Sequence, residues 1–240
     1  MKKQFTMILR SMFLLASFNS CSKIDINSPI VEEDRTLSTF SQITSKIAGD
    51  VILVQDNNQK VTVQAQENII DDLITEVTGG HLNIYMNNRP KITGGKHFKV
   101  YISVPKIDKL VLEGSGNIEA QNEISTNDNL DLVLKGSGNI ELQSLACKEV
   151  NAELSGSGKL NIYGGNANQI HSKLKGSGNF NAAHFTVNEA WINLSGSGNA
   201  TLRITDYLDA KLTGSGNIYY YGNPRVKKNI TGSGRVEPKN

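Results

Sequence analysis

Apolar and polar residues alternate around a tetrad, Gly-Ser-Gly followed by Asn, Lys or Arg, that occurs seven times in the second half of the chain. Its first glycines are Gly114, Gly136, Gly156, Gly176, Gly196, Gly214 and Gly232, spaced by 22, 20, 20, 20, 18 and 18 residues. Leu or Ile stands two residues before each of them, and an apolar residue stands four residues after. The residues between these positions are mostly polar, and such period-2 alternation predicts strands with one buried face.

Each repeat therefore predicts a strand, a Gly-Ser-Gly corner, a second strand and a return. One pair of short strands cannot bury its apolar face alone, but stacked repeats form a continuous core. We predict an all-β fold, a parallel β-helix (β-solenoid) with coils of about 20 residues, a rise of about 4.8 Å per coil and ladders of stacked Ser and Asn. A propeller blade would need about 40 residues, and a calcium-binding roll would need Asp in each turn.

The N-terminal region has the composition of an export signal and a tether. Residues 1–20 combine Lys2, Lys3 and Arg10 with a short apolar run, which predicts a signal peptide too short to span a membrane. Cys21 follows at the expected cleavage point, so we predict that it carries a lipid anchor, with residues 21–39 as the tether. The competing interpretation is a soluble secreted protein that is cleaved elsewhere.

Residues 40–109 are β-rich but lack the tetrad, and residues 110–240 form the regular solenoid with seven repeats. Strands are expected at residues 50–55, 60–66, 75–78, 81–86 and 98–104, with a short helical turn within residues 67–73. We interpret the segment 40–109 as irregular N-terminal coils or a cap that closes one end of the core. A separate domain is the alternative.

The stretch from about residue 40 to 235 resembles the head GIN domain family of auto-transporter adhesins, which is common in Bacteroidetes. The resemblance rests on Gly49–Gln55, Val61–Val63, Glu67–Ile69, Leu82–Ile84 and the repeated Leu-x-Gly-Ser-Gly-Asn-Ile, as in Leu112–Ile118. It implies a right-handed β-helix on a secreted or lipid-anchored protein, and it supplies no catalytic residues.

Stacking in register allows the outward faces to be read across coils. One outward column contains His171, Trp191 and Asp209, and an exposed Trp among hydrogen-bonding side chains could stack on a sugar ring. The alternative, which the sequence alone favours, is that a return loop covers Trp191 as local core. Tyr219 and Tyr221 should point outward from the other sheet, with Tyr220 inward, and they form a second candidate contact surface.

Candidate chemistry is sparse. The four His show no metal-ligand spacing, no nucleotide or nucleophile motif is present, and Asp206 and Asp209 lack a supporting arrangement for glycoside cleavage. We therefore predict no enzyme activity, no cofactor and no metal. The formal charge of +2 falls to about −1 without residues 1–20, which argues against nucleic acid as a partner.

The leading hypothesis is a non-catalytic lipoprotein of the cell envelope, attached to the outer membrane at its periplasmic face or on the cell surface. It would present a rigid face to an extracellular glycan or protein and contact the membrane through its lipid alone. A structural component that oligomerises by stacking of coil ends is the alternative, and a carbohydrate-active enzyme is the third.

Overall fold

The computed structural model describes residues 28–87 and 98–239, which form eighteen strands and one 3-10 turn. The N-terminal half contains β1 (Ile30–Asp34), β2 (Gln42–Ser45), β3 (Asp50–Gln55), β4 (Lys60–Gln66), η1 (Ile70–Asp72), β5 (Leu73–Thr78), β6 (His81–Met86), β7 (Lys99–Val104), β8 (Lys109–Gly114) and β9 (Asn117–Ser125). The remainder contains β10 (Asn129–Gly136), β11 (Asn139–Gly156), β12 (Lys159–Ile162), β13 (Gly165–Gly176), β14 (Asn179–Gly196), β15 (Asn199–Gly214), β16 (Asn217–Tyr221), β17 (Arg225–Thr231) and β18 (Arg235–Pro238).

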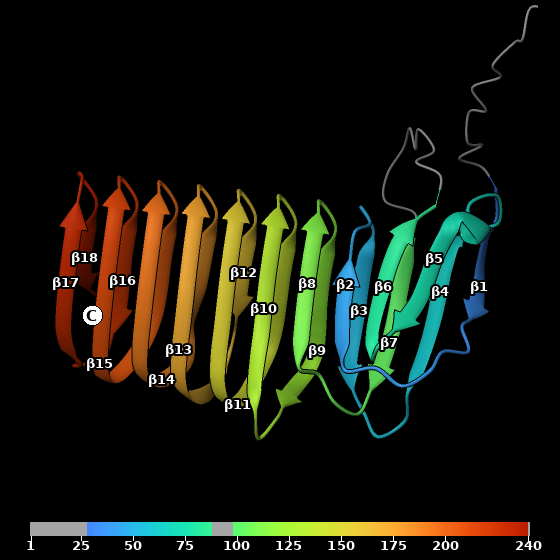
Figure 1. Ribbon diagram of the computed structural model, residues 1–240, viewed down its shortest axis with the longest axis horizontal. Helices are drawn as coiled ribbons and strands as arrows, with labels where there is room; N and C mark the ends of the chain where they lie inside the picture. Colours follow the sequence, from blue (N-terminus) through green and yellow to red (C-terminus); the bar gives the residue numbers. More distant parts are fainter. Residues whose placement is uncertain (1–27, 88–97, 240) are drawn as a thin grey trace, which may run out of the picture.

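The predicted β-solenoid is confirmed. Successive coils pair in parallel with tetrad on tetrad, as in Gly136 with Gly156 and Gly176 with Gly196. Figure 1 shows the coils side by side along the long axis, with β17 and β18 at one end and β1 at the other. We call the sheet that contains β8, β10 and β17 the first sheet, and the sheet that contains β9, β16 and β18 the second sheet.

The core lies between the two sheets. The Leu residues that precede the first six corners are all buried, and so are the apolar residues that follow all seven, for example Leu154 and Leu160 at 1% exposure each, whereas Ile230 on the last coil is 38% exposed. One cluster of buried side chains extends from Phe40 to Val236. The columns that the spacing predicts are therefore the columns that the fold buries.

The Gly-Ser-Gly corners hold adjacent coils together. The carbonyl oxygens of the first five first glycines each accept two N–H groups from the next coil, as when Gly156 accepts from Ser177 at 3.0 Å and from Gly178 at 2.9 Å. A Cβ on the second glycine would overlap the backbone of the preceding coil, as at Gly198 against Gly178. The corner thus requires glycine for space.

The chain does not stack its coils in sequence order near the N-terminus. The coil made by β2 and β3 lies between the β6–β7 coil and the β8–β9 coil, because β2 pairs with both β6 and β8, and β3 with both β7 and β9. β5 and β4 then extend the two sheets with antiparallel pairs. Figure 1 shows this interleaving in the blue and green strands.

Two expectations for the N-terminal region differ from the structure in detail. Residues 30–34, placed within the tether, form β1, which pairs antiparallel with β4 and packs Val31 against the core. The helical turn expected within residues 67–73 is the 3-10 turn η1. Residues 1–27, including the predicted signal peptide and Cys21, lie outside the described residues.

Both ends of the solenoid carry a charged residue in an inward-facing column. On the last coil, Lys228 of β17 pairs with the buried Ala210 of β15. At the other end, Glu33 of β1 pairs with the buried Val63 of β4. Pro238, which lacks an N–H, occupies the end of β18. Inward charges and edge prolines are the devices by which sheet proteins prevent strand addition.

We expect Gly198→Ala to destabilise the fold, because the added Cβ overlaps the Gly178 carbonyl oxygen. The loss should reach the upper end of the roughly 1–3 kcal/mol typical of overpacked sites. Chemical denaturation measures it. Gly164→Ala is the matched control, since its Cβ would lie 3.5 Å from the Gln143 carbonyl oxygen and should cost little. Equal stability of the two variants would contradict the close approach at the corners.

We expect Lys228→Val to promote self-association, because it completes an apolar column next to Ile230, which is already 38% exposed on the edge strand. Static light scattering should show a concentration-dependent rise in mass. Lys175→Val removes the same charge from an exposed position on the same sheet, away from the edge, and should stay at the parental mass. A Lys228→Val protein that keeps the parental mass would show that this charge does not protect the end.

Candidate functional site

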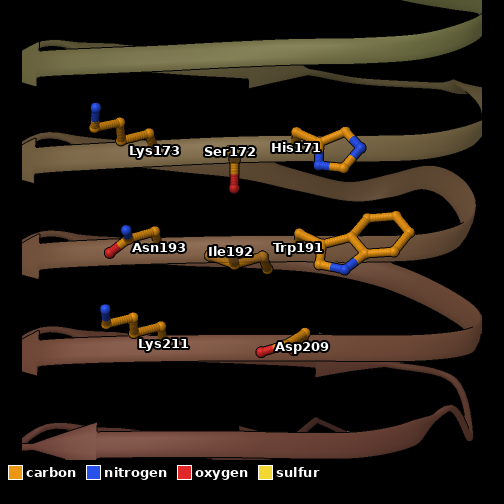
Figure 2. Close-up of a pocket in the computed structure, with 8 residues that line it drawn as sticks. All are labelled: His171, Ser172, Lys173, Trp191, Ile192, Asn193, Asp209 and Lys211. Atoms are coloured by element: carbon orange, nitrogen blue, oxygen red, sulfur yellow. The ribbon is translucent and has the colours of Figure 1, made fainter.

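The outward column predicted to contain His171, Trp191 and Asp209 is confirmed by the strand register. His171 on β13 pairs with Trp191 on β14, which pairs with Asp209 on β15. All three side chains therefore project from the first sheet at the same height along its strands. Figure 2 shows them one below another on three successive coils.

Trp191 lies at the surface and is only partly buried, so the alternative that it forms local core is wrong. The His171 and Trp191 rings stack with centroids 4.5 Å apart and an interplanar angle of 11°. Tyr207 approaches Trp191 edge-on at 6.1 Å. In-register coils bring rings of adjacent strands to stacking distance, so the sheet itself orients the indole.

Asp209 is held by two neighbours on the same face. Lys227 Nζ lies 2.8 Å from Asp209 Oδ2, and the Tyr207 hydroxyl donates to the same oxygen at 3.5 Å. The hydrogen bond from Lys227 to Asp209 raises the pKa of Lys227. Both contacts use Oδ2, so the carboxylate is oriented while Oδ1 can still accept a hydrogen bond from a ligand.

A second outward column runs beside the first and contains Lys173, Asn193 and Lys211. A surface hollow of about 380 Å³ is lined by both columns and by the intervening Ser172 and Ile192 (Figure 2). This is at the small end of the roughly 300–1,000 Å³ usual for ligand sites. The hollow thus combines one aromatic surface with donors and acceptors on a hydrogen-bonded sheet.

Tyr219 and Tyr221 lie on the second sheet, so the fold does not bring them to the Trp191 hollow. Lys239 Nζ lies 4.5 Å from the Tyr219 ring centroid, and Arg203 Cζ lies 5.0 Å from that of Tyr221. Tyr220 packs against the core, in agreement with the predicted alternation. These tyrosines form a separate surface that is covered in part by cations.

Tyr207 is the site residue that sequence reasoning missed. It stands two residues before Asp209, so the same period-2 rule places it on the same face. Its ring contacts Trp191, its hydroxyl contacts Asp209, and Arg225 Cζ lies 5.0 Å from its centroid. Considering one further outward column, two residues before that of Asp209, would have identified it.

Reactive groups are scattered in the part of the chain that the structure describes. Residues 28–87 and 98–239 contain no group of three or more His, Cys, Asp or Glu side chains that could hold a metal ion. Cys147 is half-buried, and burial raises its pKa to about 12, so its thiol is almost entirely protonated at neutral pH. Asp206, the other acid weighed for hydrolysis, is exposed.

The described residues include no helix long and apolar enough to cross a membrane. Glu119 and Glu141 stack one coil apart, and the Tyr163 hydroxyl donates to Glu141 Oε2 at 3.3 Å. Burial, with the nearby Glu141 charge, raises the pKa of Tyr163. This stack lies on the second sheet, away from Trp191.

Solved structures with the same fold include bacterial proteins described as adhesins. A putative adhesin from Bacteroides fragilis NCTC 9343 is 25% identical, with a TM-score of 0.81 over 88% of this chain and 97% of that one. A putative lipid binding protein from Parabacteroides distasonis ATCC 8503 is 26% identical, with a TM-score of 0.75 over 91% and 100%. A putative adhesin from Parabacteroides merdae ATCC 43184, at 20% identity and a TM-score of 0.70 over 89% and 98%, shares the fold.

No curated protein matches the sequence. The family model described as "putative auto-transporter adhesin, head GIN domain" matches residues 39–224, which cover most of the chain and all but the last coil of the solenoid. The resemblance seen in the sequence is thereby confirmed, and the protein belongs to the head GIN domain family.

Proposed function

We propose that the protein is a non-catalytic, adhesin-type binding protein of the cell envelope that contacts an extracellular glycan or protein through the Trp191 hollow. The observation that carries the proposal is the stacked His171–Trp191 pair, which lies partly exposed beside a hollow of about 380 Å³. Membership of an adhesin family and the structural likeness to adhesins support the same role.

A rigid sheet suits this role because binding then costs little conformational entropy. The strands that carry the hollow are hydrogen-bonded to neighbouring coils on both sides, and the His171 and Tyr207 rings restrict Trp191. Side chains that are ordered before binding avoid about 0.5–1.5 kcal/mol each in ordering cost. An exposed indole also offers a large apolar surface to a sugar ring or to a partner side chain.

Attachment to the envelope is part of the proposal. Cys21 would carry the lipid and hold the protein at the outer membrane, on its periplasmic face or at the cell surface. Pro29 already accepts a hydrogen bond from Glu67 N, and β1 begins at Ile30, so the residues between Cys21 and Pro29 would be the spacer. We propose contact with the membrane through this anchor alone.

The alternative role, assembly by stacking of coil ends, is less well supported. The last coil does expose Ile230 and two unpaired strand edges. However, the inward-column Lys228 and the edge proline Pro238 oppose strand addition at that end. The outward face around Trp191 carries no comparable obstacle to a partner.

The test compares the purified protein with its Trp191→Ala variant on a glycan array and on an array of extracellular matrix proteins. We expect selective binding by the parent and its loss in the variant. Tyr163→Ala removes another exposed aromatic from the opposite sheet and should bind like the parent. Binding that survives Trp191→Ala, or no binding by the parent on either array, would contradict the proposal.

Thermal unfolding separates a lost contact from a damaged fold. Because Trp191 is only partly buried, Trp191→Ala should cost less than about 2 kcal/mol, whereas alanine at a fully buried aromatic typically costs about 3–5 kcal/mol. Phe180→Ala, at 1% exposure, provides that reference. Similar losses in the two variants would assign Trp191 a structural role.

A further inference from the structure

Charge is unevenly distributed along the solenoid. From Gly165 to the C-terminus the sequence contains nine Lys and Arg against four Asp and Glu, whereas residues 28–87 and 98–164 together contain nine against eighteen. Because coils stack along one axis, this difference in sequence becomes a difference in space between the two ends. The Trp191 hollow lies in the basic third.

Some lysines of the first sheet have a carboxylate partner, and others, such as Lys175 and Lys228, form no ion pair within the described residues. Lys109, Lys135 and Lys227 each pair with a carboxylate, at 3.7, 3.0 and 2.8 Å. Within the described residues, no ion pair is formed by Lys173 or by Lys211, and both are exposed at the hollow. Two ammonium groups are therefore available to a ligand.

These two lysines flank Asn193 in one column. Each is one coil away from Asn193, so about 10 Å separates their backbones, and flexible side chains can converge over the amide between them. Figure 2 shows Lys173, Asn193 and Lys211 in line, parallel to the His171, Trp191 and Asp209 column. Two carboxylates lie near these lysines. Glu153 is the register partner of Lys173 one coil away and forms no ion pair with it within the described residues, and the charge of Asp209 in the neighbouring column is offset by Lys227.

We propose that the hollow binds an acidic saccharide, with a sugar ring against Trp191 and a carboxylate or sulfate group held by Lys173, Asn193 and Lys211. The inference rests on the proposed binding function and specifies its ligand. Asp209 accepts a hydrogen bond from a sugar hydroxyl through Oδ1. The aromatic surface contributes ring contact, and the two lysines select for negative charge.

Size and chemistry favour a saccharide over an acidic protein surface. The hollow spans three coils and is small, which suits one or two sugar rings better than a broad interface, whose sides typically bury about 800 Å². Six of its eight lining residues have polar side chains, and the other two are Trp191 and Ile192. The acidic end of a second copy of this chain is the competing occupant, and the experiment below distinguishes it.

The experiment measures binding of the purified protein to polygalacturonate and hyaluronate as carboxylated polymers, dextran sulfate as a sulfated one, and dextran and carboxyl-reduced polygalacturonate as neutral ones. We expect binding to at least one acidic polymer and none to the neutral ones. Affinity for that polymer should fall about tenfold in the double variant Lys173→Gln/Lys211→Gln, and added salt should weaken binding by the parent. The preferred polymer shows whether the anion is carboxylate or sulfate.

The double variant Lys99→Gln/Lys159→Gln is the matched control, because it removes the same charge from exposed positions on the second sheet. It should bind like the parent. Equal losses in both double variants would mean nonspecific attraction by net charge and would overturn the proposal. Thermal unfolding of each variant should match the parent, since all four lysines are exposed.

The remaining outcomes separate this inference from the proposed function. Binding to neutral glycans that Trp191→Ala abolishes and the lysine variant retains would overturn the acidic ligand and leave the binding role intact. No binding to any acidic polymer would also overturn the inference. If the parent protein in addition bound nothing on the glycan and matrix protein arrays, the proposed binding role would be overturned as well. Self-association at low salt that the Lys173→Gln/Lys211→Gln variant loses would assign the lysines to a second copy.

Discussion

The close approach of backbone to backbone at the Gly-Ser-Gly corners is the constraint on which the structure depends. At five of the seven corners the first glycine's carbonyl oxygen accepts two N–H groups from the next coil, and the second glycine lies where a Cβ would overlap the preceding coil. A coil rise of about 4.8 Å is possible only if the turn is this thin. Every ladder, core column and surface column follows from that spacing.

Stacking at this spacing places equivalent residues on top of one another. Amide, charged and aromatic side chains differ in how they interact with an equivalent neighbour one coil away, and the surface columns show these differences. Asn side chains suit stacking, so Asn139 donates to Asn117 at 3.0 Å and Asn217 donates to Asn199 at 3.1 Å. Some charged columns alternate in sign, as in Lys46, Glu113 and Lys135, whereas Glu119 and Glu141 stack with like charge. The aromatic pair at Trp191 is a third solution, in which rings of adjacent coils stack.

The sequence predicts what its spacing encodes and misses what depends on non-local pairing. Columns such as His171–Trp191–Asp209 follow from counting residues from each corner, and they agree with the register. The insertion of β2 and β3 between later coils could not be predicted, because their corner, Ile47–Asp50, retains only the second glycine of the tetrad. Tyr207 was missed because its outward column, two residues before that of Trp191 and Asp209, was not considered.

This architecture separates stability from recognition in space. Inward columns carry the core, and outward columns are free to vary provided that stacked neighbours remain compatible. The ends are occupied by Glu33 and Lys228 in inward positions, so the extended faces are the surfaces left for a partner. A hollow between two outward columns can therefore acquire a binding role by a few substitutions, with no change in the coil. The column of Trp191 shows this freedom, since its outward position is Asp131, Asn151, His171, Trp191 and Asp209 on successive coils while the inward columns stay mostly apolar.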